Sequence, residues 1–134
     1  MPNTPPQRYE LKSPIDGSIL AFDIRARRDQ ETSFDVAVKT PWFYGTAASS
    51  TYMVPSLANL FHDMAAEWTG WIGEKSWGDL ENNVEIRASA DKTGHISLSI
   101  TLTGHDGYTQ LRTCLQFEAG QLERFAEEVA LLFS

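Results

Sequence analysis

Three histidines are the side chains of this sequence best suited to acid–base or metal chemistry. His62 and His105 each precede an aspartate, the kind of partner that a general base would use. His95 and His105 lie at opposite ends of one predicted strand, and at about 3.3 Å per residue they are roughly 33 Å apart. They cannot share one metal ion. His62 falls on the polar side of a predicted helix, where a surface histidine needs no special explanation.

The single cysteine and the paired serines lack the surroundings of a catalytic nucleophile. Cys114 is expected on the polar face of a strand, away from any helix N-terminus that would lower the pKa of its thiol. Ser49 and Ser50 are not part of a Gly-x-Ser-x-Gly elbow. The spacing of Gly70 and Gly73 does not match a phosphate-binding loop. We therefore expect no catalytic residues, no metal site and no cofactor.

Composition limits the class of partner. The chain has 18 acidic and 11 basic residues, which gives a net charge of -7. Affinity for nucleic acid comes largely from lysine and arginine, so a nucleic-acid partner is not expected. No apolar run approaches the length of a membrane span, and the first residues do not resemble a signal peptide. We expect a soluble cytoplasmic protein without a membrane partner, and a single cysteine fits a reducing compartment.

The predicted elements are organised around an amphipathic segment at residues 55–80. Pro55 suits the first turn of a helix, and Gly70 marks its end. The segment 68–78 then carries three of the four tryptophans of the chain, which we interpret as a turn that closes one end of the core. The apolar residues of the helix share one face through helical spacing, namely Leu57, Leu60, Phe61, Met64, Ala65 and Trp68.

Alternating apolar and polar residues predict the strands, with Leu20, Phe22, Ile24 and Ala26 on one face of strand 18–27. This strand and the next form a predicted hairpin, and predicted turns at 91–94 and 104–107 join the last three strands. Residues 45–51 are small, polar and without periodicity, so we expect a loop there that can act as a mobile lid. A final amphipathic helix begins near Gly120, where Glu123 is placed to cap the helix start. The predicted strands comprise residues 9–11, 18–27, 34–39, 84–90, 96–103 and 108–117.

The order β-β-β-α-β-β-β-α predicts an α+β domain. It consists of an antiparallel sheet of about five or six strands with two helices packed on one face. Leu98 and its apolar neighbours should face the helices, whereas Ser99 and the alternating polar residues should face solvent or a partner. Residues 1–134 are expected to form a single domain without an internal repeat, and residues 1–7 to form a loose tail.

Acidic residues gather around the tryptophan-rich turn. Aromatic residues among carboxylates are typical of a docking surface for a basic protein. The alternative explanation is that the tryptophans belong to the core and the carboxylates to a solvated face. The predicted partner-binding residues are Asp63, Glu67, Glu74, Asp79, Glu81, Trp71 and Trp77.

Residues 55–134 also carry the motifs Phe61-x-x-Met64, Trp68-x-Gly70-Trp71, Asp91-x-x-Gly94-His95 and Gly120-x-Leu122. In these motifs the chain resembles small bacterial proteins of unknown function that occur among the immunity proteins of polymorphic toxin systems. The resemblance implies a protein that binds and blocks one cognate toxin, and it supplies no shared catalytic residues.

We therefore expect a non-enzymatic immunity protein that binds a basic toxin acting in the cytoplasm. One alternative is an assembly module of a larger bacterial complex. Another is a ligand-binding or enzymatic domain that uses the polar sheet face under the 45–51 loop. The residues of that face are Arg87, Ser99, Gln110, Arg112 and Cys114.

Overall fold

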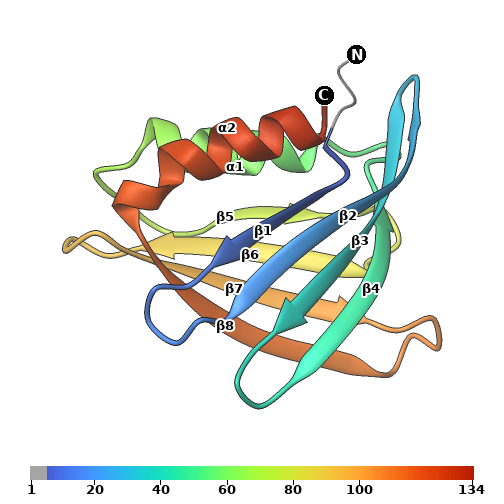
Figure 1. Ribbon diagram of the computed structural model, residues 1–134, viewed down its shortest axis with the longest axis horizontal. Coiled ribbons are helices and arrows are strands. Elements are labelled where there is room, and N and C mark those ends of the chain that lie inside the picture. Colours follow the sequence, from blue (N-terminus) through green and yellow to red (C-terminus); the bar gives the residue numbers. More distant parts are fainter. Residues whose placement is uncertain (1–5) are drawn as a thin grey trace.

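Eight strands and two helices form residues 6–134, the part of the chain that the computed structural model describes (Figure 1). A short 3-10 turn, η1 (Ala119–Gln121), precedes the second helix. The helices are α1 (Leu57–Ala66) and α2 (Leu122–Leu132). The strands are β1 (Arg8–Lys12), β2 (Ile19–Arg28), β3 (Glu31–Lys39), β4 (Tyr44–Ser50), β5 (Lys75–Gly78), β6 (Val84–Ala90), β7 (His95–Thr103) and β8 (Gln110–Glu118).

The strands form two antiparallel four-stranded sheets, in the orders β1-β2-β3-β4 and β5-β6-β7-β8. The α+β class and the antiparallel pairing predicted from the sequence are confirmed. The single sheet of five or six strands is wrong, because β4 and β5 were not predicted as strands. With these two strands, each half of the chain has the order β-β-β-β-α. The halves thus repeat one topology, although the sequence shows no repeat.

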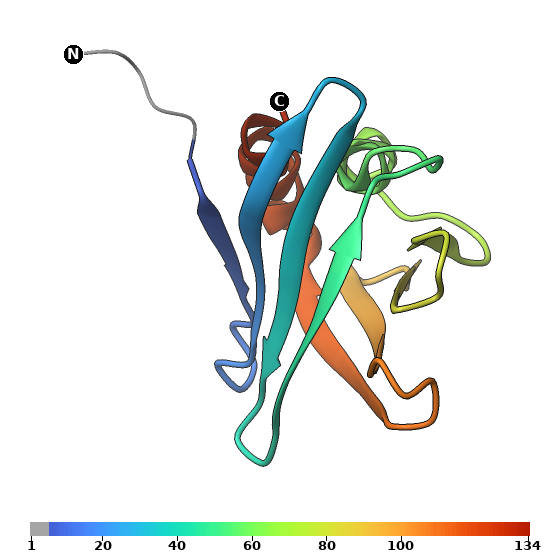
Figure 2. The ribbon, with the colours of Figure 1, turned by 90° about the vertical axis from the view of Figure 1, so that its right-hand side faces the viewer.

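Each helix contacts a strand of the other half of the chain as well as residues of its own half. α1 contacts β5, the first strand of the second sheet, and α2 contacts β1, the first strand of the first sheet. The two helices also pack against each other and lie along one side of both sheets (Figures 1 and 2). These contacts join the two halves of the chain.

Aromatic rings join the four parts of the core. The ring of Phe133, directly after α2, lies 6.1 Å from that of Phe22 in β2 and 4.9 Å from that of Phe34 in β3. Phe22 also meets Phe61 of α1, with ring centroids 6.2 Å apart. Trp77 of β5 reaches Phe34 from the second sheet at 6.0 Å. Both sheets and both helices therefore share one buried cluster.

β4 occupies the segment predicted as a loop and lid. Its inward positions Gly45, Ala47 and Ser49 lie opposite core residues of β3 in the register. These side chains are small because β4 approaches β6 and β7 of the other sheet closely. A Cβ atom on Gly45 would lie only 2.7 Å from Cδ1 of Leu111. Because the inward residues are small, the segment lacks the apolar alternation from which a strand is predicted. The prediction of a loop is therefore wrong.

A β-bulge in β2 changes which residues face the core. The register shifts between Ile24 and Ala26, so Ala26 no longer continues the apolar face as predicted. Arg27 takes the inward position instead, and its Nη2 donates to the carbonyl oxygen of Leu132 at 2.9 Å. An arginine at this point satisfies a free carbonyl at the C-terminus of α2. The bulge therefore ties the first hairpin to the last helix.

The helix ends differ from the predicted ones. α1 begins after Ser56, whose side-chain oxygen accepts the N–H of Ala58, and Pro55 precedes this cap. The capping box at η1 joins Glu118 and Gln121 and does not involve Glu123. Residues 1–5 of the predicted tail lie outside the described residues. Pro6 and Gln7 are held on β2, because the Gln7 carbonyl accepts the N–H of Ile24 at 2.7 Å.

Asp91 and Asp106 each order one of the two turns that join β6, β7 and β8. Asp91 accepts the backbone N–H groups of Thr93 and His95, and the bond from His95 contributes most to lowering the pKa of this carboxyl. Hydrogen bonds from Thr109, first from its hydroxyl, lower the pKa of Asp106 to about 2. The predicted turns are confirmed, and both carboxylates help to hold them.

Substitutions in β7 can test the predicted alternation of buried and exposed residues. Leu98 is buried in the shared core and Ser99 is exposed, as predicted. We expect Leu98→Ala to lower the free energy of unfolding by about 2–5 kcal/mol through loss of apolar contact and the cavity left behind. Ser99→Ala should change it by less than about 0.5 kcal/mol. Urea denaturation of the two variants measures both values, and equal losses would contradict the assignment of faces.

The close approach at Gly45 gives a second prediction. Gly45→Ala should lower the free energy of unfolding by about 1–3 kcal/mol, because the new methyl group overlaps Leu111. Thr46→Ala, one residue along on the outward face, is the matched control and should have little effect. If the contact is the cause, Gly45→Ala with Leu111→Ala should destabilise less than the two single changes added together. Simple additivity in denaturant melts would rule out the contact as the cause.

Candidate functional site

The segment after α1 exposes large apolar side chains. α1 ends at Ala66, and the backbone N–H of Glu67 bonds the carbonyl of Met64. Trp68 therefore lies beyond the helix and is 63% exposed, although the sequence predicted it on the buried face. Ile72 is fully exposed in the same segment. These two side chains, missed from the sequence, form the apolar part of a candidate docking surface.

Trp71 lies half-buried beneath this segment. Its Nε1 donates to the carbonyl oxygen of Ala88 at 3.2 Å, which fixes the ring against β6. Nζ of Lys75 lies 5.4 Å from the centre of the same ring and 3.2 Å from Oε1 of Glu67. Lys75 thus connects the tryptophan to the acidic end of α1. Trp71 is partly exposed, and its contact with a partner stays a prediction.

Trp77 has a structural role. It is 5% exposed, and its Nε1 donates to the carbonyl oxygen of Pro55 at 2.7 Å, just before α1 begins. A buried indole needs such an acceptor, and this one fixes the start of the helix. Trp77 is therefore a core residue and is not available to a partner on the surface.

Asp79 is also removed from the predicted surface. It is 8% exposed, and its carboxylate accepts the hydroxyl of Ser49 at 2.6 Å and the backbone N–H of Asn83 at 2.8 Å. Ser49 belongs to β4, so this bond connects the two sheets where they approach each other. The carboxylate orders the turn between β5 and β6 and joins it to the first sheet.

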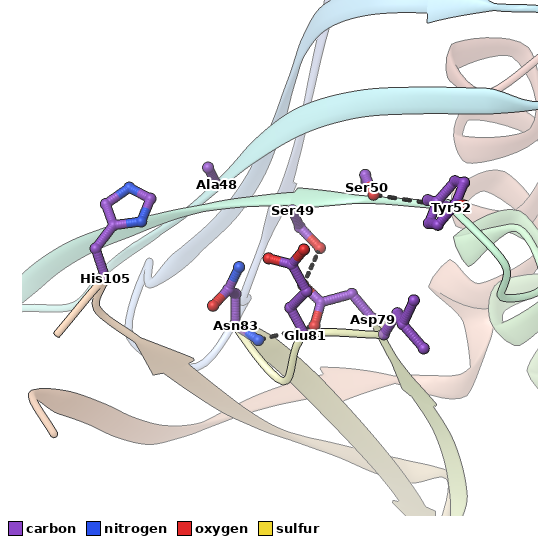
Figure 3. A pocket seen from close by; sticks show the side chains of 9 residues that line it. Ala48, Ser49, Ser50, Tyr52, Asp79, Glu81, Asn83 and His105 are labelled. Atoms are coloured by element: carbon purple, nitrogen blue, oxygen red, sulfur yellow. Dashed lines mark hydrogen bonds between the residues drawn. The ribbon is translucent and has the colours of Figure 1, made fainter. Parts of the chain in front are cut away.

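A hollow lies beside this turn (Figure 3). Glu81 lines it together with His105, Asn83 and Tyr52. The ring of His105 stands apart from the hydrogen-bonded Ser49 and Asp79 side chains in Figure 3. Within residues 6–134 no hydrogen bond joins that ring to either side chain. The three residues thus do not form a nucleophile–base relay, and Glu81 belongs to this hollow rather than to the segment that follows α1.

The remaining predicted carboxylates are exposed in α1 and in the segment that follows it. Asp63 is exposed one helical turn before Glu67, and Glu74 is exposed directly before β5. Glu74 also pairs with Arg87 at 3.7 Å. We call this set the acidic–tryptophan surface. It consists of Asp63, Glu67, Trp68, Trp71, Ile72 and Glu74.

The helices extend the negative charge around this surface. Residues 56–67 and 119–134 together contain five acidic residues and one arginine. Glu123 and Glu127 are exposed on α2, which packs beside α1. Most of the net charge of the protein is therefore carried by the helical side of the molecule.

The polar face of the second sheet brings together most of the alternative site. Arg87, Ser99, Arg112 and Cys114 line one shallow hollow, whereas Gln110 lines another. Arg87 is engaged by Glu85 at 3.1 Å. The 45–51 segment does not cover this face, because β4 packs against the opposite side of the sheet. The predicted lid over these residues is wrong.

In residues 6–134, the part of the chain that the structure describes, no three histidine, cysteine, aspartate or glutamate side chains gather as a possible metal site. Neither of the two helices found there is long and apolar enough to cross a bilayer.

The fold is an α+β domain of two β-β-β-β-α halves, in which Trp68 and Ile72 are exposed after α1. A family model described as a family of unknown function (DUF6228) matches residues 11–134, and the chain belongs to this family. No curated protein matches it. The structure is similar to one described as crystal structures of trypanosoma bruciei MRP1/MRP2, with 18% identity and a TM-score of 0.51 over 95% of this chain and 84% of that chain. That likeness concerns the fold alone.

The different roles of Asp79 and Glu81 can be tested by two substitutions. Asp79→Ala should lower the free energy of unfolding by about 1–3 kcal/mol, because it leaves the Ser49 hydroxyl and the Asn83 N–H without their acceptor. Glu81→Ala is the control and should change stability by less than about 0.5 kcal/mol. Thermal melts at neutral pH provide the comparison. If Asp79→Ala leaves stability unchanged, the carboxylate does not hold the turn.

Proposed function

We propose that this protein is a non-enzymatic, cytoplasmic immunity protein that binds and neutralises a basic bacterial toxin. The observation that supports it best is the acidic–tryptophan surface. There, Trp68 and Ile72 are exposed beside carboxylates on the most negatively charged side of the molecule. A toxin domain that acts on nucleic acid must carry positive charge to bind phosphates, and its surface would complement this one.

The parts of this surface would act at different stages of binding. Asp63 and Glu74 are exposed, so their charges would mainly guide a basic partner to the surface. Trp68 offers a large apolar ring at the centre, which is typical of the residue that contributes most to affinity. Trp71 and Lys75 are already held in place by the contacts to Ala88 and Glu67, so this part of the surface loses little freedom on binding.

A second candidate function is ligand binding on the polar face of the second sheet. The observation that favours it is the convergence of Arg87, Arg112 and Cys114 on one hollow. Of the two arginines, Arg87 is already paired with carboxylates. The hollow is open and shallow, so we rank this function below toxin binding.

The test of the proposed function is charge reversal at the acidic–tryptophan surface. Asp63→Lys with Glu74→Lys should slow association with the toxin by about tenfold at low salt and reduce the salt dependence of the rate. Trp68→Ala should instead raise the dissociation rate, at a cost of about 2 kcal/mol. The partner to test is a toxin-like protein encoded by a neighbouring gene, and binding kinetics at two salt concentrations are the measurement.

The matched control is Asp29→Lys with Glu81→Lys, which changes the net charge equally at exposed sites outside the surface. It should leave the association rate much less affected. Growth rescue by co-expression of the wild-type protein with the toxin is the accompanying assay. Absence of both rescue and binding would refute the immunity function. Equal effects of the two charge reversals would retain the function and refute this surface.

A further inference from the structure

The turn between β3 and β4 presents three consecutive aromatic side chains to solvent. Trp42, Phe43 and Tyr44 are 83%, 68% and 67% exposed. Ile15, in the turn between β1 and β2 at the same end of the first sheet, is 63% exposed. Exposed apolar residues scattered singly are ordinary, but three adjacent aromatic rings beside an isoleucine mark an interaction site. We call these four residues the aromatic tip.

The backbone of the turn is fixed so that these rings point outward. The hydroxyl of Thr40 accepts the N–H of Trp42 at 3.2 Å and that of Phe43 at 2.9 Å. The N–H of Thr40 donates to the carbonyl of Phe43 at 2.8 Å. Pro41 restricts the chain further, because its ring fixes φ. The tip is therefore ordered before any partner binds, which lowers the entropic cost of binding.

Two lysines accompany the aromatic tip. The register places Lys12, Ile19, Lys39 and Tyr44 in one row across the outer face of the first sheet. Neither lysine makes an ion pair within residues 6–134, whereas Arg8 and Arg25, farther along the same face, pair with carboxylates. The one acidic residue of the nearby turn, Asp16, accepts the backbone N–H of Ser18.

Charge is thus separated along the molecule. The acidic helices lie at one end, and the turn that carries Trp42 and Phe43 lies at the opposite end in both views (Figures 1 and 2). An anionic surface would attract the lysine-bearing end and repel the helical end. The molecule would therefore approach such a surface in one orientation.

We propose that the aromatic tip docks on an anionic phospholipid surface. Tryptophan and tyrosine favour the boundary between lipid headgroups and hydrocarbon, and lysine can contact headgroup phosphates while its stem stays apolar. A projecting, convex tip can enter this boundary without a complementary pocket. A nucleic acid would need a continuous cationic track, which paired arginines do not provide. A basic protein would be repelled by the lysines.

This inference does not rest on the proposed immunity function. It differs from the expectation of no membrane partner, which came from the absence of a spanning run and of a signal-peptide pattern. Neither property describes the local chemistry of one turn. Docked by the tip, the molecule would hold the acidic–tryptophan surface away from the lipid and free for a protein.

The experiment is co-sedimentation of the full chain with vesicles of phosphatidylcholine, with and without about a third of phosphatidylserine. Binding should be about tenfold tighter to the anionic vesicles at low salt. Trp42→Ser with Phe43→Ser should weaken it more than tenfold, and Lys12→Gln with Lys39→Gln should remove the preference for anionic lipid. The matched control is Tyr108→Ser, which removes an aromatic ring that is 90% exposed in the turn between β7 and β8 and should bind like the wild type. Circular dichroism confirms that each variant is folded.

Each other outcome would overturn the proposal. Absence of binding to both kinds of vesicle, or unchanged binding by Trp42→Ser with Phe43→Ser, refutes lipid docking. Self-association in lipid-free solution that disappears in the same variant would assign the tip to a second copy of the chain. Tighter binding to a single-stranded oligonucleotide than to vesicles, lost in this variant, would assign it to nucleic acid. The toxin assays are separate, so either proposal can fail alone.

Discussion

The close crossing of β4 with the second sheet is the constraint on which the rest of the structure depends. Two sheets and two helices can share one core only if the sheets come near each other at one side and leave room for the helices at the other. Gly45, Ala47 and Ser49 allow this approach, because larger inward side chains would hold the sheets apart. The bond from Ser49 to Asp79 then joins the sheets at the same place. The crossing is thus both a steric and a polar contact.

The tryptophans of the 68–78 segment show how local contacts divide similar residues between stability and recognition. Trp77 donates to a backbone carbonyl inside the core, and Trp71 donates to one at the edge of the core. Trp68 is exposed to solvent because α1 ends before it. The carboxylates divide in the same way, since Asp79 turns inward and Asp63 remains on the surface. The side chains that remain exposed are therefore those members of the sequence cluster that the core does not use.

The sequence predicted the α+β class, the hairpins and the faces of β6, β7 and β8, because half-buried strands show strict alternation. It failed at β4, where the sheet crossing selects small residues, and at β5, which has only four residues. Alternation also carries no information about which strands share a sheet. Of the predicted site, Glu67 and Trp71 are joined through Lys75, and Asp63 and Glu74 are exposed in the same stretch of the chain. Asp79 could not be assigned to the interior, because its partner Ser49 is distant in the sequence. Trp68 was placed on the wrong side because the helix ends two residues earlier.

The packing of the last helix on the first sheet has a consequence for synthesis. The ring of Phe133 packs on Phe22 and Phe34, and Arg27, next to the bulge, donates to the carbonyl oxygen of Leu132. A growing polypeptide makes the first sheet long before these residues exist. Until α2 is complete, the nascent chain carries a sheet with one apolar face exposed to solvent. The protein must therefore finish folding after translation of α2. The incomplete chain, before α2 is made, is the form that would need a chaperone.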